Sequence, residues 1–418
     1  MKKVLSQLLV FVTIVFFITA GVTLFIEYKN KESLGEKSKI EIKIENNKII
    51  VPEETSIVKT NYIFSKNYFV IRTILAILIP IFILKSSLLE YAEELFNKKI
   101  KNNFSQGVIM GIAYTIINFV ILFPIAFFSS FYRLKLVGLL NYGFIDWLLD
   151  LLKGEILNLV IFSLFLGISF YIIKSIKRWI LSLGVLYALI MIFGVFIYPV
   201  VIDPLINDIK PVSDKALETK IINLAEKNGI KNLKVYEIKK SDETSALNAY
   251  MTGIFSTKRI VIWDTTLQSL NEDEILSVVA HEIGHYKLNH IPKGMVLEAV
   301  LSIITYGSSI ILLLMINRKS RRALKGPYGL GYVLLYSTII SMVTSPISLY
   351  YSRKIEIEAD RFAIEATNDN LTNGILELRF METNLSPYNV DEWYKILRFD
   401  HPTAKERIEL SNSYDYDK

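Results

Sequence analysis

Cysteine is absent from the 418 residues, and histidine occurs only four times. The first absence excludes a thiol nucleophile, a cysteine-ligated zinc or iron–sulfur site and any disulfide framework. Charged residues are also scarce, at 21% of the chain, compared with about 25% in soluble proteins. Lys and Arg outnumber Asp and Glu by 47 to 41, but no compact basic stripe with interleaved aromatic side chains accompanies this excess. Nucleic acid is therefore excluded as a partner.

The chain contains several long runs of apolar residues. Hydrophobic residues make up 52% of the chain, and the mean hydropathy is +0.37. The hydrocarbon core of a bilayer is about 30 Å thick and requires about 20 apolar residues in a helix. We therefore predict a predominantly α-helical multi-pass membrane protein in contact with membrane lipid. Its seven transmembrane helices are expected at Val4–Ile26, Tyr68–Leu89, Gly107–Phe128, Ile156–Ile173, Trp179–Val201, Met295–Ile316 and Leu330–Tyr350.

The segments around the first span allow two further predictions. Lys2 and Lys3 precede the first apolar run, as in a secretory signal peptide. That run is longer than the about 7–15 residues of a signal peptide, and no Ala-x-Ala site follows it, so we expect an uncleaved anchor. Further on, Lys39–Pro52 alternates apolar and polar residues around Asn46 and Asn47. This alternation predicts a small, solvent-facing β-hairpin.

Two charged residues fall inside predicted spans, Arg72 in the second and Glu298 in the sixth. A charge in the bilayer core is costly, so such residues commonly face a protein interior and serve the protein's activity. The alternative is that each is paired with another polar group for structural reasons. The sequence favours neither interpretation over the other.

Three of the four histidines are concentrated in the segment Leu276–His290, which reads LSVVAHEIGHYKLNH. His281, Glu282 and His285 form the pattern H-E-x-x-H. Positions i and i+4 lie on one face of a helix, so both imidazoles can reach one metal ion while the glutamate points toward the water on that metal. The pattern predicts one Zn²⁺ ion per chain.

A catalytic zinc ion takes three protein ligands and leaves a fourth position for water. No cysteine is available, and His290 lies five residues beyond His285, off the shared helical face. We therefore expect the third ligand to be a distant carboxylate. Glu356 and Asp360 stand at positions i and i+4, so one can ligate the metal while the other accepts the free N–H of a ligating histidine.

The two motifs together resemble the membrane zinc peptidases of the CAAX prenyl protease 1 family. The resemblance also rests on shorter pieces of sequence between about residues 200 and 410. These pieces are PLIN at Pro204–Asn207, NAYMTG at Asn248–Gly253, KRIVIWD at Lys258–Asp264, HPT at His401–Thr403, and ERI at Glu406–Ile408. Seven spans in similar places extend the similarity loosely to the whole chain.

The resemblance implies a role for several residues. Glu356 would be the third zinc ligand beside His281 and His285, and Asp360 would lie behind the ligands. Asn248 would hold the substrate backbone, and His401 would face the developing oxyanion. The family often carries Ser-Ser-His-Ser before Asn-Ala-Tyr, whereas this chain has Thr244–Leu247 there, so a histidine is missing from the substrate edge.

The resemblance also implies a division of the chain. Residues 1–202 would hold the first five spans with a polar loop at 27–66, and residues 295–350 would hold the last two. Residues 203–294, with the H-E-x-x-H helix, and residues 351–418, with the E-x-x-x-D helix, would form the two halves of a split zincin-like metalloprotease domain.

The implied activity is metal-assisted peptide hydrolysis, in which Glu282 takes a proton from water and passes it to the leaving amine. The substrate would be a peptide or protein that can carry a prenyl group, cleaved near its C-terminus. An alternative is a quality-control protease similar to the HtpX proteins, which degrades damaged membrane proteins. A zinc-stabilised membrane scaffold without catalysis is a third interpretation, although zinc binding alone does not require Glu282.

The orientation in the membrane is predicted differently by two arguments. Lys and Arg are concentrated in short loops on the side of the N-terminus, which by the positive-inside rule places those loops in the cytoplasm and the zinc domain outside. The family resemblance implies a zinc domain on the cytoplasmic side. We adopt the family arrangement because the long polar loops also carry many basic residues.

Overall fold

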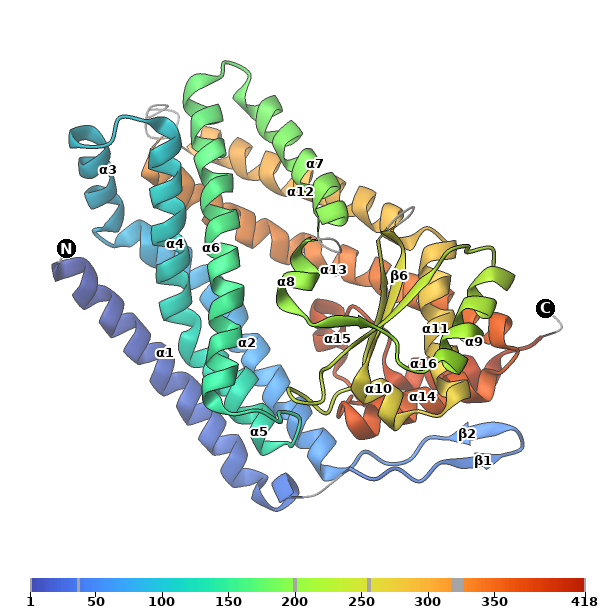
Figure 1. The fold of residues 1–418 in the computed structure, drawn as a ribbon. Coiled ribbons are helices and arrows are strands. Elements are labelled where there is room, and N and C mark those ends of the chain that lie inside the picture. The colour runs from blue at the N-terminus through green and yellow to red at the C-terminus, as the bar shows by residue number, and fades with distance from the viewer. Residues whose placement is uncertain (1, 36–37, 198–200, 254–256, 317–325, 417–418) are drawn as a thin grey trace.

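The computed structural model describes residues 2–35, 38–197, 201–253, 257–316 and 326–416. Long helices dominate this part of the chain, and Figure 1 shows several of them gathered on one side of the molecule, away from the sheet. The long helices are α1 (Lys2–Lys29), α2 (Ser56–Lys85), α4 (Asn103–Ala126), α6 (Phe144–Ser175), α7 (Trp179–Ile197), α12 (His290–Ile316) and α13 (Pro327–Thr367). A π-helical turn, η2 (Phe127–Tyr132), and α5 (Arg133–Leu136) continue α4.

Six helical segments in the described residues are long and apolar enough to cross a membrane. They are α1, α2, α4 continued to Leu136, α6, residues His290–Leu312 of α12, and α13. Six of the predicted spans coincide with these segments. The remaining one, Trp179–Val201, falls on α7 and continues into residues 198–200, which lie outside the described part of the chain.

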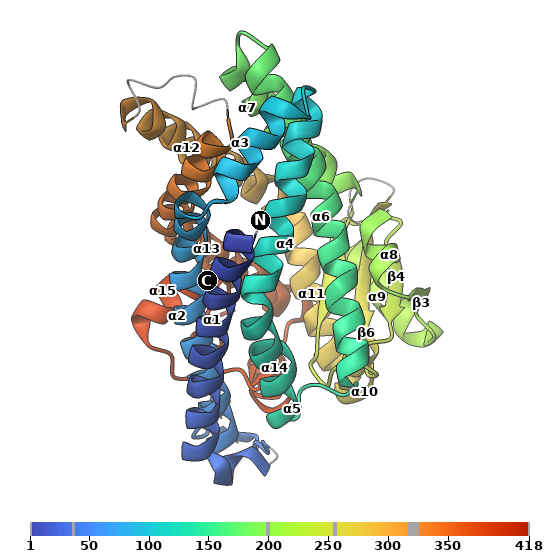
Figure 2. The ribbon, with the colours of Figure 1, turned by 90° about the vertical axis from the view of Figure 1, so that its left-hand side faces the viewer.

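Small residues bring two of these helices close together. Figure 2 shows α4 and α6 running side by side. A Cβ atom added at Gly111 would lie 2.5 Å from Ser163 Cα, and one added at Gly107 would collide with the carbonyl of Leu166. Gly107 and Gly111 are four residues apart, the spacing that lets transmembrane helices approach along their backbones. The backbone of α4 therefore packs directly on α6.

The two charged residues in the spans are both hydrogen-bonded to neighbouring helical segments. Arg72 on α2 donates through Nη2 to Ser129 Oγ at 2.8 Å, and Glu298 on α12 accepts from the hydroxyl of Ser348 on α13. Each charge therefore has a polar partner on another element.

A small mixed sheet forms the centre of the water-soluble part. Its strands are β3 (Ile209–Pro211), β4 (Lys234–Ile238), β5 (Ala249–Thr252) and β6 (Arg259–Trp263), in the order β3-β4-β6-β5. β4 and β6 are parallel, and β5 runs antiparallel to β6. Because β5 is last in the strand order, it forms one edge of the sheet. The buried side chains of Ile260 and Ile262 pack in one core with Val279 and Ile283 of the helix that covers the sheet.

Shorter helices belong to the part of the chain that contains this sheet. They are α8 (Asp203–Ile206), α9 (Lys215–Lys227), α10 (Asp264–Ser269), α11 (Glu272–Lys287), α14 (Asn370–Thr383), α15 (Glu392–Arg398) and α16 (Ala404–Ser413). Two others lie among the long helices: α3 (Leu88–Lys98) contacts α2 and α13, and the 3-10 turn η1 (Lys31–Gly35) contacts α1 and α2. Elements from before α12 and after α13 share the core, since Leu376 of α14 packs with the residues of α11 and the sheet.

The predicted β-hairpin is present, as β1 (Lys43–Glu45) and β2 (Lys48–Ile50). Asn46 and Asn47 form its turn with φ of 49° and 58°, in the left-handed region that asparagine tolerates. The expectation that it faces solvent is wrong for one face. Ile49 is only 2% exposed and packs in a cluster with residues of α14 and α16, while the side chain of Asn412 bonds the backbone of Ile49 on both sides.

Candidate metal centre

Helix α11 begins at a capping box and has one apolar face. The side chain of Asn271 accepts from the backbone N–H of Glu274, and the side chain of Glu274 accepts from the backbone N–H of Asn271. Ile275, Val279 and Ile283 are buried in the core beside the sheet. Because a helix presents residues three or four apart on one face, this apolar face directs His281 and His285 to another side of α11.

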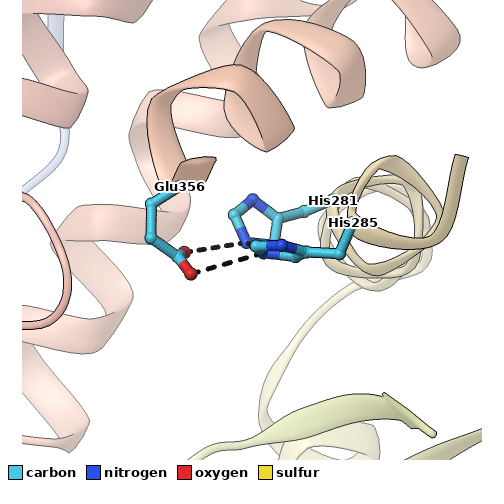
Figure 3. Close-up of side chains that lie close together, drawn as sticks. All are labelled: His281, His285 and Glu356. Carbon is cyan, nitrogen blue, oxygen red and sulfur yellow. Dashed lines mark hydrogen bonds and ion pairs between the residues drawn. The ribbon is translucent and has the colours of Figure 1, made fainter. Parts of the chain in front are cut away.

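The two imidazoles and a carboxylate from a different helix converge. Figure 3 shows Glu356 pointing toward His281 and His285. The Nε2 atoms of the histidines lie 3.0 Å apart, Glu356 Oε2 lies 3.1 Å from His281 Nε2, and Glu356 Oε1 lies 3.4 Å from His285 Nε2. One ligand atom from each residue lies within 4.8 Å of the others, so the three side chains could hold a metal ion.

The donor set fits zinc. Zinc bonds to nitrogen and oxygen are about 2.0–2.2 Å long, so tetrahedral ligand atoms stand about 3.3–3.5 Å apart. The separations of 3.0–3.4 Å between these atoms are close to that value. Two imidazoles and one carboxylate also form a donor set used by catalytic zinc sites that keep a fourth position open.

Close packing of α11 on α13 brings the carboxylate to the histidines. Gly284 lies between the two histidines in sequence, and a Cβ atom there would stand 3.0 Å from the ring of Phe362 on α13. Because Gly284 has no side chain, the ring of Phe362 fits against α11, and Glu356 reaches the imidazoles although it lies on a helix that also carries a predicted span.

Asp360 lies behind His281, away from Glu356. Its Oδ1 is 2.8 Å from His281 Nδ1, and its Oδ2 accepts from Arg407 Nε at 2.7 Å. Arg407 Nη1 also lies 2.8 Å from Glu377 Oε1. The imidazole of His281 is thus held between two carboxylates, and one of them, Asp360, is anchored by the guanidinium of Arg407, whose side chain is 13% exposed.

Sequence reasoning gave no role to Arg407 or Glu377. Arg407 lies in the segment Glu406–Ile408, which supports the family resemblance but by itself indicates no role for the arginine. A signal was available, since Arg407 lies on the same face of α16 as Ala404 and Ser411, both buried. A charged residue on the buried face of a short amphipathic helix requires a buried partner of opposite charge.

The charges of this network shift its pKa values. Burial disfavours the charged form of His281, but its contacts with Asp360 and Glu356 outweigh burial and raise its pKa to about 10. The two carboxylates that favour a proton there also favour a divalent cation. Burial, helped by the charge of Asp360, outweighs the lowering effect of Arg407 and raises the pKa of Glu377 from 4.5 to about 7. Burial lowers the pKa of Arg407, but the carboxylates of Asp360 and Glu377 have the larger effect, and the pKa is raised above its ordinary value.

The other predicted residues lie around the same cavity, whose volume is about 490 Å³. Glu282 lines it, and its Oε2 accepts from the backbone N–H of Met251 on β5 at 2.9 Å. Asn248 lines it just before β5 and has an exposed side chain. His401 Nε2 lies 3.5 Å from Glu356 Oε2, and its Nδ1 lies 3.0 Å from Asp400 Oδ1. The structure thus brings together every site residue predicted from the sequence.

Comparison with known proteins gives two adjoining matches. A family model described as "CAAX prenyl protease N-terminal, five membrane helices" matches residues 46–208, and that of peptidase family M48 matches residues 211–413. The chain belongs to peptidase family M48. The resemblance drawn from the sequence motifs is thereby confirmed, and the protein is an integral multi-pass membrane protein.

Several relatives of this M48 protein are known. It is 35% identical over 270 residues to YhfN of Bacillus subtilis, named as an uncharacterized metalloprotease, with 63% of each chain covered. It is 31% identical over 284 residues to a CAAX prenyl protease 1 homolog of Oryza sativa, with 64% of each chain covered. The matched regions therefore span less than two thirds of these relatives. The crystal structure of S. mikatae Ste24p has the same fold, with a TM-score of 0.71, 22% identity, and coverage of 97% of this chain and 99% of that chain.

The raised pKa of Glu377 predicts a pH-dependent contribution to stability. Its pKa is about 7 in the folded chain, against 4.5 as the ordinary value. The folded state therefore holds a proton that the unfolded state has lost, and the resulting stabilisation is present below about pH 4.5 and is lost as the pH rises through about 7. We expect the stability of the wild type relative to Glu377→Gln to fall by up to about 3 kcal/mol between pH 4.5 and 7.5.

Thermal unfolding of both proteins in detergent across this pH range measures the difference. Titrating groups far from position 377 are shared by the pair and cancel in the comparison. A difference that stays flat, or that increases with pH, would contradict a neutral Glu377 in the folded protein.

Proposed function

We propose that this protein is a membrane-embedded zinc metalloendopeptidase that hydrolyses peptide bonds near the C-terminus of prenylated or lipid-associated substrates. The observation that carries the proposal is the convergence of His281, His285 and Glu356 beside Glu282 at one cavity. In this proposal the three residues are the zinc ligands. Residues 203–294 and 351–418 form the peptidase domain, and the spans in 1–202 and 295–350 embed it in the membrane.

When bound, a zinc ion would supply Lewis acidity toward a water molecule and the scissile carbonyl. Glu282 takes a proton from the attacking water and delivers it to the leaving amine. His401 lies at the edge of the same site and is exposed to the cavity, so it donates a hydrogen bond to the oxyanion that develops on the carbonyl. Asp360 accepts the Nδ1 proton of His281 and so keeps Nε2 free to ligate the metal.

The substrate backbone would bind along the edge strand β5. An extended peptide can add a strand to an open sheet edge and form main-chain hydrogen bonds with it. Asn248 lies where β5 begins, and its side chain is exposed at the cavity. From there it can bind the backbone of a peptide that runs past Glu282.

The cavity is bounded partly by a membrane helix, which supports a lipid-associated substrate. Asn61, Tyr62 and Ser65 of α2 line it together with the metal-site residues, and these positions directly precede the apolar run predicted from Tyr68. The helix α13 that carries Glu356 extends without a break from an apolar segment into the site. A peptide attached to a lipid in the bilayer would therefore have only a short distance to travel to the site.

Replacing the proposed general base tests the mechanism. Glu282→Gln preserves the shape of the side chain but cannot accept a proton, so we expect zinc content to remain at the wild-type level while kcat falls at least about 100-fold. Metal analysis of the purified protein and a peptide-cleavage assay measure the two quantities.

The matched control is Glu272→Gln, an exposed position in the first turn of the same helix, which should leave cleavage unchanged. Unchanged turnover in Glu282→Gln would refute the assignment of the base. Retention of the protein's biological effect by a Glu282→Gln variant that cleaves nothing would favour the non-catalytic scaffold.

The preference for a prenyl group is tested with a matched pair of peptides. One carries a farnesylated cysteine and the other the same cysteine unmodified. Burial of only two CH₂ groups, at about 0.8 kcal/mol each, would raise kcat/KM at least tenfold, so we expect a difference of that size or larger. Equal kcat/KM values, together with cleavage of unfolded membrane proteins, would favour the HtpX-like quality-control protease instead.

We further propose that the zinc domain lies on the cytoplasmic side. The absence of cysteine makes single-cysteine labelling straightforward. Glu226 on α9 is exposed in the peptidase part, and Lys99 is exposed between α3 and α4, three spans away. In intact cells, we expect a membrane-impermeant maleimide to label Lys99→Cys at once but Glu226→Cys only after permeabilisation. The opposite pattern would support the positive-inside argument.

A further inference from the structure

His290 is a buried histidine that the proposed mechanism does not use. Helix α11 ends at Lys287, and α12 begins at His290. Between them Asn289 has a φ of 57°, a left-handed conformation that asparagine adopts more readily than most residues. This turn redirects the chain. A continuing helix would have carried His290 away from His285, whereas the break returns it to that residue.

The ring of His290 packs against that of His285 and is closed off from water. The two ring centroids lie 5.0 Å apart, and the two Nδ1 atoms lie 3.0 Å apart. His290 is only 2% exposed. Its other nitrogen, Nε2, lies 3.3 Å from Oε2 of Glu358, which is two residues beyond Glu356 on α13.

Only one arrangement of protons satisfies these contacts with His285 as a neutral metal ligand. His285 turns its Nε2 atom to the site, so Nε2 must offer its lone pair and the proton must reside on Nδ1. That N–H then donates to Nδ1 of His290, which leaves the proton of His290 on Nε2. The Nε2–H group in turn faces the carboxylate of Glu358, which can only accept.

We propose that His290 and Glu358 are positioning residues that fix the orientation and tautomer of His285 as a zinc ligand. The inference rests on the ligand set proposed above. A ligating histidine commonly donates its second N–H to such a partner, and loss of the partner typically costs 10–100-fold in metal affinity or activity.

The two ligating histidines are supported in different ways. His281 donates directly to a carboxylate, Asp360, which Arg407 anchors. His285 donates to the imidazole of His290, which in turn donates to Glu358, a carboxylate that is 40% exposed. Asp360, Glu358 and His290 each lie within five residues of a proposed ligand in sequence, but Asp360 and His290 contact the ring nitrogens of the ligands that face away from Glu356. The third histidine therefore serves the metal site without contacting the metal.

Three substitutions at position 290 separate positioning from packing. His290→Leu fills a similar space but accepts no hydrogen bond. His290→Asn places its amide oxygen near the position of Nδ1 and keeps the acceptor for His285. His290→Gln places its amide nitrogen near the position of Nε2 and keeps the contact with Glu358. The matched control is Lys354→Gln, which removes an exposed charge that lies 3.9 Å from Glu358 and does not contact His290.

The measurements are made on the full chain in detergent. Competition with a chelator gives the affinity for Zn²⁺, and the visible spectrum of the Co²⁺-loaded protein reports ligand geometry. We expect His290→Leu to bind Zn²⁺ about 10–100-fold more weakly and to change the Co²⁺ bands. His290→Asn should stay within a few-fold of the wild type, His290→Gln should fall between the two, and Lys354→Gln should be unchanged.

Equal affinities for wild type and His290→Leu, or equal losses in His290→Leu and His290→Asn, would overturn the proposal, because a packing role does not distinguish an acceptor from a methyl group. Glu358→Leu gives the same test from the other end of the relay, should His290→Leu fail to fold. Here too, affinity and Co²⁺ bands like those of the wild type would count against the proposal. His285→Ala tests the proposed ligand set separately: retention of Zn²⁺ in that variant would contradict the metal centre itself.

Discussion

The close contact between α11 and α13 is the constraint on which the candidate site depends. Two imidazoles on one helix cannot complete a zinc site, and the third donor has to come from elsewhere in the fold. Gly284 faces the ring of Phe362. Because glycine leaves room for that ring, α13 lies close enough to α11 for Glu356 to reach both histidines. A wider separation would leave the same residues present but unable to share one ion.

The site also requires charge that is buried and balanced. Asp360, Glu356 and Glu377 are almost fully buried near one another, and the guanidinium of Arg407, whose side chain is 13% exposed, contacts the first and the third. Burying charged groups without partners is costly, and a pair that loses one member is strongly destabilised. The network therefore constrains the position of His281 more tightly than packing alone would. It also makes the soluble part depend on contacts between α13, α14 and α16.

The membrane and soluble parts are joined by continuous structure as well as by loops. α13 carries apolar residues along its first half and Glu356 along its second. Near the start of α2, Tyr62 and Lys66 both bond Asp391, just before α15. The hairpin between α1 and α2 packs Ile49 against residues of α14 and α16 in the peptidase part. These connections place the polar cavity that His281, Glu282 and Glu356 line next to the membrane helices.

The sequence by itself determined the features that depend on local periodicity and composition. Apolar runs predicted the spans, alternation around Asn46 and Asn47 predicted the hairpin, and the i, i+4 spacing placed His281 and His285 on one face. Each of these depends on residues within one or two turns, or within one hairpin, so it can be read from neighbouring letters. The roles of Glu356 and Asp360 were supplied by family resemblance, since their spacing alone left the two carboxylates interchangeable.

The tertiary structure decided what lies between distant segments. It separated Glu356, which faces the Nε2 atoms of both histidines, from Asp360, which faces Nδ1 of one. It showed that Arg407 and Glu377 extend the network, that Ile49 is buried, and that a left-handed residue at position 289 returns His290 to His285. Such contacts depend on how helices pack and where the backbone changes direction. Helical periodicity does not encode either of these, because it assumes that the helix continues.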